Sequence, residues 1–283
     1  MASFRAFVLA ALCAWPLLPA TAVIPALAQQ VTAPISTTEM MQVTGLDVIF
    51  SQFGAAIADS ARQEQVTNDE RFIARWEATA LSSFDSRTMH GRLAKLLDGR
   101  FTADEQQVFA SFFRSSFGLR ISAIERAVAI LPAAEQVSAM AEGEILLVAA
   151  DATRRGQIDE MLELVSAEIS GAMVAQSVRA MLMAMSVANQ QGDIDVPWAE
   201  IDAQVAAMQP TLLAEVEQSQ RTLMLYAYRE LSEVDLDHYI EFLRTPAAKK
   251  FYAIAAYAVG RVVTDGMSAF GEALAQRMKS VNV

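Results

Sequence analysis

Apolar residues recur every three to four positions along most of this 283-residue chain, and runs of β-branched residues are scarce. Such spacing places the apolar side chains on one face of an α-helix. The i, i+3, i+4, i+7 order of a buried helical stripe is followed, for example, by Leu236, Tyr239, Ile240 and Leu243. The pattern predicts an all-α protein, folded as a helical bundle.

Capping signals mark where several of these helices should begin. A hydroxyl residue followed three positions later by an acidic residue can form a capping box around the first helical turn. This signature occurs at Ser36–Glu39, Thr67–Glu70 and Thr102–Glu105. Each instance predicts a helix start, and Ser232 should cap a further helix in the same way.

Glycine and proline divide the first half of the chain. The first helix is expected to break near Gly45 and to continue to about Gln63, because glycine adopts positive φ without strain. Another helix should cover Ser86 to Leu97, before an Asp-Gly turn. Pro132 should end the helix that precedes it, because proline cannot donate a backbone hydrogen bond.

The second half should be organised in a similar order. A connecting helix is expected from about Ala133 to Ala152, with Gly156 closing that segment, and a long helix from about Ile158 to Asn189. Pro210 should kink or split the next helix, because its ring clashes with the carbonyl one turn earlier. The last helix should run towards Met278.

An unusual motif occurs twice, 130 positions apart, as "FASFFRSSFGLRI" and "YIEFLRTPAAKKF". The matched positions are Phe109 with Tyr239, Phe112 with Phe242, Phe113 with Leu243, Arg114 with Arg244, Ser115 with Thr245, Gly118 with Ala248, and Arg120 with Lys250. A weaker match, at an offset of 121, joins Met40–Gly54 to Met161–Ala175. Each motif predicts a helix, a corner and a second helix, whose apolar faces can bury each other.

These signals predict the organisation of the whole chain. Residues 29–35 form an extended arm, 36–131 a first helical repeat, 132–157 a connecting helix and 158–283 a second repeat. The alternative explanation is that two amphipathic helices look alike by chance. The coincidence of caps, corners and arginines favours duplication.

The second motif resembles the bacterial domain-of-unknown-function family 2059 (DUF 2059). The resemblance is carried by an "F-[YL]-R-[ST]-P-x-[GA]-x-K" corner, which is met by Phe242, Leu243, Arg244, Thr245, Pro246, Ala248 and Lys250. The first motif departs from it, with Ser116 in place of the proline and Leu119 where Lys249 stands. The resemblance implies an exported, all-helical domain with no assigned activity, and it brings no catalytic residues.

The first 28 residues have the pattern of a cleavable signal peptide. Arg5 supplies the positive charge, Ala6–Leu18 is the apolar region, and Ala26 and Ala28 form a small-x-small cleavage site before Gln29. Cys13 follows Leu12, where a lipoprotein signal would have a small residue. The expected location is therefore the periplasm, without a lipid anchor.

Charge and composition narrow the classes of partner. The chain has 22 basic and 33 acidic residues, a net charge of −11 that becomes −12 when Arg5 is removed. An acidic chain is a poor nucleic-acid binder, because phosphate contacts need a basic surface. Cleavage also removes the only cysteine, which excludes disulfides. The apolar segment Phe251–Gly260 is too short to cross a membrane.

Residues with chemical potential are present but do not form a recognisable constellation. His90 and His238 are expected at the surface, without metal-site spacing. Paired acids could serve glycoside hydrolysis, but solvent-facing positions are expected for Glu233, Asp235, Asp237 and Glu241, and no calcium-loop series accompanies Asp193 and Asp195. The three methionines that might suggest a copper site, but should instead pack in the core, are Met181, Met183 and Met185.

Two features could bind a partner instead. A local basic cluster, which is either a solvated helix face or a surface for an anionic partner, comprises Arg87, Arg92, Lys95 and Arg100. An aromatic groove between the repeats could be lined by Phe109, Phe112, Tyr239 and Phe242, although these rings are more typical of a core.

The function expected from these features is a non-enzymatic binding or interaction module of the cell envelope, with a protein or an amphiphile as its partner and no cofactor. A structural homo-oligomer is the first alternative. A hydrolase that uses Asp or Glu is the second.

Overall fold

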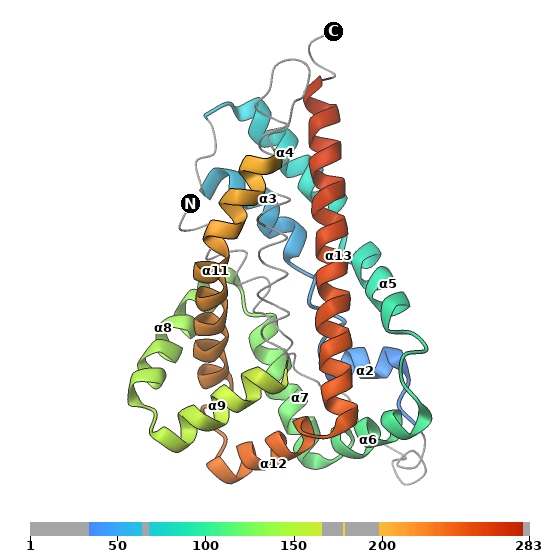
Figure 1. Cartoon of the computed structure of the whole chain (residues 1–283), viewed down its shortest axis with the longest axis vertical. Helices are drawn as coiled ribbons and strands as arrows, with labels where there is room; N and C mark the ends of the chain where they lie inside the picture. The colour runs from blue at the N-terminus through green and yellow to red at the C-terminus, as the bar shows by residue number, and fades with distance from the viewer. Residues whose placement is uncertain (1–33, 64–67, 166–177, 179–197, 280–283) are drawn as a thin grey trace.

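The computed structural model describes residues 34–63, 68–165, 178 and 198–279, and every regular element within these ranges is an α-helix (Figure 1). The all-α prediction is therefore confirmed. Several predicted features lie outside the described residues: the signal peptide, most of the extended arm, the three methionines, and Asp193 and Asp195. None of the helices in the described ranges combines the length and the apolar character that a membrane crossing requires.

The first four described helices are α2 (Thr37–Val43), α3 (Phe53–Gln63), α4 (Glu70–Ser83) and α5 (Ser86–Leu97). Ser36 caps α2 as predicted, and its hydroxyl accepts a hydrogen bond from the Glu39 amide. The chain turns after α2 at Gly45, which has a φ of 65°. The predicted cap at Thr67 is wrong: α4 begins at Glu70, because the Asp69 carboxylate accepts from the Arg71 amide.

The next four helices are α6 (Ala103–Phe113), α7 (Ser116–Ala129), α8 (Ala133–Ala149) and α9 (Ala152–Leu164). The predicted connecting helix, from about Ala133 to Ala152, corresponds to α8, which ends at Ala149, but the predicted segment 132–157 does not continue as one helix. Asp151 caps a new helix by accepting from the Arg154 amide, so the break comes before Gly156, which lies inside α9. The predicted boundary at 157 therefore falls within a helix. A side-chain cap decided this break, and the glycine did not.

The last three helices are α11 (Trp198–Ala227), α12 (Glu233–Leu243) and α13 (Pro246–Lys279). Pro210 lies inside α11 without splitting it, contrary to one of the two predicted outcomes. Pro210 and Ala206, whose carbonyl loses its helical donor, are both exposed, so water can satisfy that carbonyl.

Helix α13 forms the long axis of the molecule (Figure 1). Its 34 residues extend over about 50 Å at 1.5 Å per residue. It packs against α4, α5, α6 and α12, and α8 packs against α11 on the other side. At the α4 contact the rings of Trp76 and Phe270 lie 4.8 Å apart, and the Trp76 indole donates to the carbonyl of Ile57 at 2.7 Å.

Candidate functional site

The two predicted corners have matching local structure. Helices α6 and α12 both contain 11 residues and begin with complete capping boxes, formed by Thr102 with Glu105 and by Ser232 with Asp235. Arg114 and Arg244 stand at the two C-caps.

The helix that follows each corner also begins in the same way. The Ser115 hydroxyl accepts from the Gly118 amide at 2.9 Å, and the Thr245 hydroxyl accepts from the Ala248 amide at 3.2 Å. Residues 130 positions apart therefore make equivalent backbone contacts at both corners.

The motif aromatics pack together in the core. Phe112 stacks on Phe242, with ring centroids 3.9 Å apart and planes at 10°. Phe109 lies 5.4 Å from Phe242, and Phe112 lies 5.7 Å from Tyr239. None of these four side chains is more than 9% exposed, so they do not line an open groove. Their location favours the core interpretation over the predicted groove.

Ion pairs tie the same segments to their neighbours. Arg114 donates from Nε and Nη2 to the Glu39 carboxylate of α2, at 2.8 to 3.0 Å. Arg244 donates in the same bidentate way, from Nε and Nη2, to the Glu160 carboxylate of α9, at 2.6 and 2.9 Å. Glu39 and Glu160 are 121 residues apart, which is the offset of the weaker upstream match. Planar guanidinium groups suit this bidentate geometry.

Two further ion pairs cross between the segments. Arg120 of α7 lies 3.5 Å from Asp235 at the start of α12. Lys250 of α13 lies 2.8 Å from Glu105 at the start of α6. Arg120 and Lys250 are matched positions, and so are Asp235 and Glu105. Each segment therefore places a cation from the same motif position beside the carboxylate in the first turn of the other segment's capped helix.

A buried carboxyl lies beside the aromatic core, and the sequence analysis missed it. Glu125 of α7 is only 5% exposed, and one of its oxygens accepts from the hydroxyls of Tyr228 and Tyr239, both at 2.6 Å. The Tyr239 hydroxyl is also 3.2 Å from that of Tyr252. The available signal was helical spacing, because Glu125 falls between Ile121 and Val128 on the buried face of α7.

Burial changes the acidity of this carboxyl. Loss of solvation raises the pKa of Glu125 from 4.5 to about 7, against the opposing effect of its two tyrosine hydrogen bonds. Burial is also the main cause that raises the pKa of Tyr228 and Tyr239. A carboxyl with a pKa near 7 could exchange protons with a substrate. Its enclosure points to a structural role instead.

The histidines differ from each other. His238 is exposed as predicted, although its ring stacks 4.5 Å from that of Phe117. The surface prediction for His90 is wrong in part. Its ring is half-buried at 5.5 Å from Phe50, and its Nε2 atom has no hydrogen-bond partner among the described residues. Burial lowers the pKa of His90, which keeps the ring neutral.

The acidic residues of α12 are used in local structure. Asp235 closes the capping box, and Asp237 accepts from the Gln157 amide at 2.7 Å. Glu233 and Glu241 are exposed. Within the ranges that the structure describes, no three His, Cys, Asp or Glu side chains converge in a way that could hold a metal ion.

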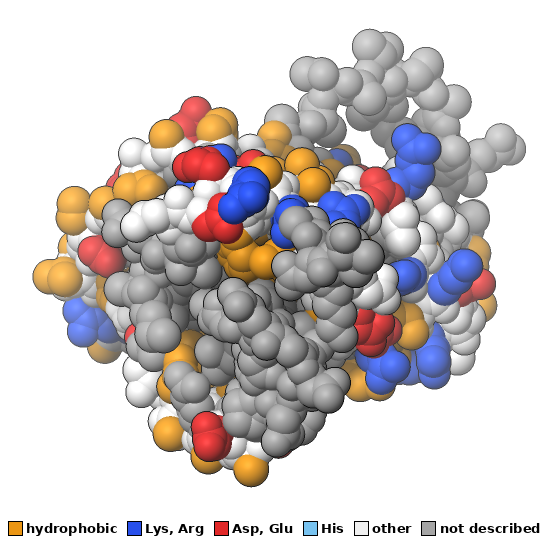
Figure 2. Space-filling model, turned by 90° about the horizontal axis from the view of Figure 1, so that it is seen from above, with side chains coloured by type: hydrophobic (Ala, Val, Ile, Leu, Met, Phe, Trp, Pro, Cys, Tyr) orange, Lys and Arg blue, Asp and Glu red, His pale blue; other side chains and the backbone are white. Residues whose placement is uncertain are grey.

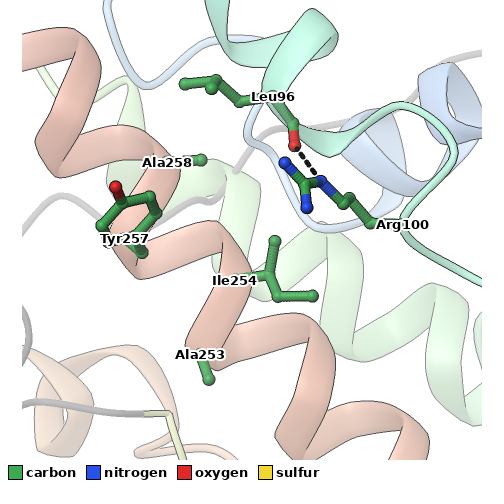
Figure 3. A pocket seen from close by; sticks show the side chains of 6 residues that line it. All are labelled: Leu96, Arg100, Ala253, Ile254, Tyr257 and Ala258. Carbon is green, nitrogen blue, oxygen red and sulfur yellow. Dashed lines mark hydrogen bonds between the residues drawn. The ribbon is translucent and has the colours of Figure 1, made fainter.

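A shallow hollow of about 250 Å³ opens between α5 and α13 (Figure 3). It is lined by Leu96, Arg100, Ala253, Ile254, Tyr257 and Ala258. The walls are mostly apolar, and Tyr257 is 59% exposed beside them. The Arg100 guanidinium extends from the turn after α5 towards the space above Ile254. Its Nε donates to the carbonyl of Leu96 at 3.2 Å.

The hollow borders the basic cluster noted in the sequence. Its four members, Arg87, Arg92, Lys95 and Arg100, are all exposed, and none makes an ion pair with a described residue. By contrast, Arg62 pairs with Glu77, and Arg126 with Asp47. Seen from above, several Lys and Arg side chains, with Asp and Glu side chains among them, lie on the right-hand side of the molecule, which is the side of α5 in Figure 1 (Figure 2). Within the described ranges the cluster is therefore a local positive surface on an acidic protein. Its member Arg87 adds to the hydrogen bonds of Thr88 in lowering the pKa of Asp85.

Comparison with known proteins gives no relative: no family model, no curated protein and no solved structure matches this chain.

Proposed function

We propose that this protein is an exported helical module of the cell envelope that binds its partner without catalysis. The signal-peptide pattern of residues 1–28 and the resemblance of the second motif to DUF 2059 support export. Catalysis would require polar groups that converge where a substrate can reach them. The carboxyl with the most perturbed acidity, Glu125, is enclosed by tyrosines instead.

The scaffold of this module consists of two related units that pack face to face. Reciprocal contacts support the duplication. Phe112 stacks on its counterpart Phe242. The ion pairs Arg120–Asp235 and Lys250–Glu105 join equivalent positions of the two segments in opposite directions. Two copies related by an approximate two-fold axis make such reciprocal contacts. A rigid frame of this kind holds a surface site in place.

The observation that carries the binding proposal is the open hollow between α5 and α13. The motif rings are buried and so cannot receive a ligand without unfolding. The hollow, in contrast, has apolar walls and includes Arg100, which makes no ion pair with a described residue. Pockets that combine apolar walls with a few polar groups are typical ligand sites.

Fractionation followed by crosslinking tests the proposal. When the full-length chain is expressed, the periplasmic fraction should contain its mature form, with the N-terminus at Gln29. Crosslinking in intact cells, followed by mass spectrometry, should capture a reproducible envelope component or a copurifying lipid. Retention in the cytoplasm, or the absence of both a partner and a lipid, would contradict the proposal.

A structural homo-oligomer is the second candidate, and an exposed stripe on α8 favours it. Val137, Ile145 and Val148 are 70 to 81% exposed, and they lie on one helical face with Ala134 and Ala141. A second copy could bury this stripe. Sedimentation of the wild type and of Val137→Glu/Ile145→Glu tests this candidate, which requires an oligomer that the double variant disrupts.

A further inference from the structure

We propose that the hollow between α5 and α13 binds a single-chain anionic amphiphile as a monomer, with its alkyl chain against α13 and its headgroup between Arg92 and Arg100. This inference rests on the proposed binding function and names its ligand class. The ligand chemistry is one alkyl chain with a carboxylate or a phosphate at one end.

The walls of the hollow suit an alkyl chain. Ala253, Ile254, Tyr257 and Ala258 follow the i, i+1, i+4, i+5 spacing, so α13 offers one continuous apolar strip. Small-molecule sites usually enclose roughly 300–1,000 Å³. A hollow of about 250 Å³ is smaller than this range and suits part of one chain better than a bulky lipid.

The cations at the mouth of the hollow suit an anionic headgroup. Arg100 lines the hollow directly, and Arg92 lies about one helical turn before the lining residue Leu96 on α5. Arg100 uses Nε to donate to the Leu96 carbonyl. Its two terminal nitrogens have no partner among the described residues, and such a planar fork recognises carboxylates and phosphates.

The charge distribution favours a monomer over a membrane surface. The nearest acidic residues on the α5 segment are Asp85, which is held by the amide and hydroxyl of Thr88, and the exposed Asp98. After the hydrogen bonds of Thr88, the charge of Arg87 also lowers the pKa of Asp85, so Asp85 partly offsets this cation. Arg92, Lys95 and Arg100 remain as a local positive patch, while the chain as a whole carries −11. The net negative charge of the protein would repel an anionic bilayer, because a bilayer is an extended charged surface. A single headgroup is attracted by the local positive patch, because more distant charges are screened.

Calorimetric titration of the purified mature protein with decanoate, below its micelle concentration, tests the proposal. Decyl phosphate should bind as well, whereas decyltrimethylammonium, which has the same chain and the opposite charge, should not. Raising the salt concentration should weaken decanoate binding. Equal affinity for the cationic and anionic probes, or the absence of decanoate binding, would overturn the proposal.

Three variants locate the site. Arg100→Gln should weaken decanoate binding at least tenfold, and Ala253→Trp should abolish it by filling the hollow. Arg87→Gln is the matched control, because it removes the same charge from α5 but lies nine residues, or about 13 Å along the helix, from Leu96. It should change affinity less than twofold. Unchanged melting temperatures would show that all three variants remain folded.

Other outcomes separate this inference from the proposed function. Decanoate binding that is unaffected by Arg100→Gln and Ala253→Trp would overturn the site but leave a binding module. Binding to vesicles of phosphatidylglycerol without binding to decanoate would overturn the monomer proposal in favour of a membrane surface. A reproducible crosslinked protein partner without any amphiphile binding would overturn the ligand class and leave the proposed function standing.

Discussion

The ring of Phe112 lies face to face with that of Phe242, its counterpart 130 residues later, with their centroids 3.9 Å apart. Two copies related by a two-fold axis would make such a contact between counterpart residues. The neighbouring contacts are reciprocal too, because Phe109 approaches Phe242 while Tyr239 approaches Phe112. The contacts between the two motifs therefore support the duplication proposed above, in which two units of one chain would pack as in a homodimer.

Removal of either central ring should destabilise the whole fold. Phe242→Ala and Phe112→Ala should each lower the free energy of unfolding by about 3–5 kcal/mol, because a buried ring is replaced by a cavity. The double variant should lose less than the sum, by about 0.5–1.5 kcal/mol, if the stacked pair couples. Urea denaturation measures all three.

Val234→Ala is the control for this series. Val234 lies on the same helix as Phe242 and is 78% exposed, so its truncation should change stability by less than about 0.5 kcal/mol. A ring variant that melts like the wild type would contradict the core role of these aromatics.

The two matched arginine–glutamate pairs should differ in strength. The Arg114 side chain is 18% exposed, whereas that of Arg244 is 56% exposed. Arg114→Met should therefore lower the free energy of unfolding by about 1.5–3 kcal/mol, because it removes charge-assisted hydrogen bonds that are shielded from water. Arg244→Met should cost less than about 1 kcal/mol, because solvent weakens an exposed pair. Equal losses in chemical denaturation would contradict this ranking.

The buried Glu125 should make stability depend on pH. Its pKa is raised from 4.5 to about 7 in the folded protein, so the folded state binds more protons than the unfolded state between these values. Glu125 therefore contributes stability that is fully present below pH 4.5 and is lost as the pH rises to 7. At 1.36 kcal/mol per pH unit, the loss is about 3 kcal/mol.

Glu125→Gln removes the titration but keeps a carbonyl oxygen that can accept from Tyr228 and Tyr239. In the variant, a plot of unfolding free energy against pH should lack the loss that Glu125 causes between pH 4.5 and 7. The variant should also be more stable than the wild type at pH 8. Identical pH profiles for the two proteins would show that Glu125 does not titrate in this range.

Two helical glycines should respond oppositely to alanine. A Cβ on Gly91 would meet nothing within 4 Å, so Gly91→Ala should stabilise the protein by about 1 kcal/mol through helix propensity. A Cβ on Gly118 would lie 2.0 Å from the Phe112 carbonyl oxygen, so Gly118→Ala should destabilise it by about 1–3 kcal/mol. Thermal denaturation should give a higher melting temperature for Gly91→Ala and a lower one for Gly118→Ala than for the wild type.

Gly156→Ala is a matched control, because this glycine is also open and lies inside α9. It should stabilise the fold about as much as Gly91→Ala does. A loss of stability at either open position would contradict the helix-propensity explanation.

Local signals in the sequence determined the helices. The predicted helix Ser86–Leu97 matches α5 residue for residue, and the capping box of Thr102 with Glu105 forms as expected. These features depend on residues within one turn of each other, so periodicity and capping chemistry suffice. Where two local signals competed, sequence reasoning failed: Asp151 began a new helix, and Gly156 did not end one.

Only the tertiary structure decided which surfaces meet and which remain open. The recurrence of the motif could be recognised in the sequence. The ion pairs that Arg120 and Lys250 each make with an acidic residue of the other segment could not. The burial of Glu125 among tyrosines 103 and 114 residues away depends on how four segments pack. The hollow likewise joins Leu96 to Ile254 across the chain. Contacts between distant residues follow from the packing of whole helices, which no local pattern specifies.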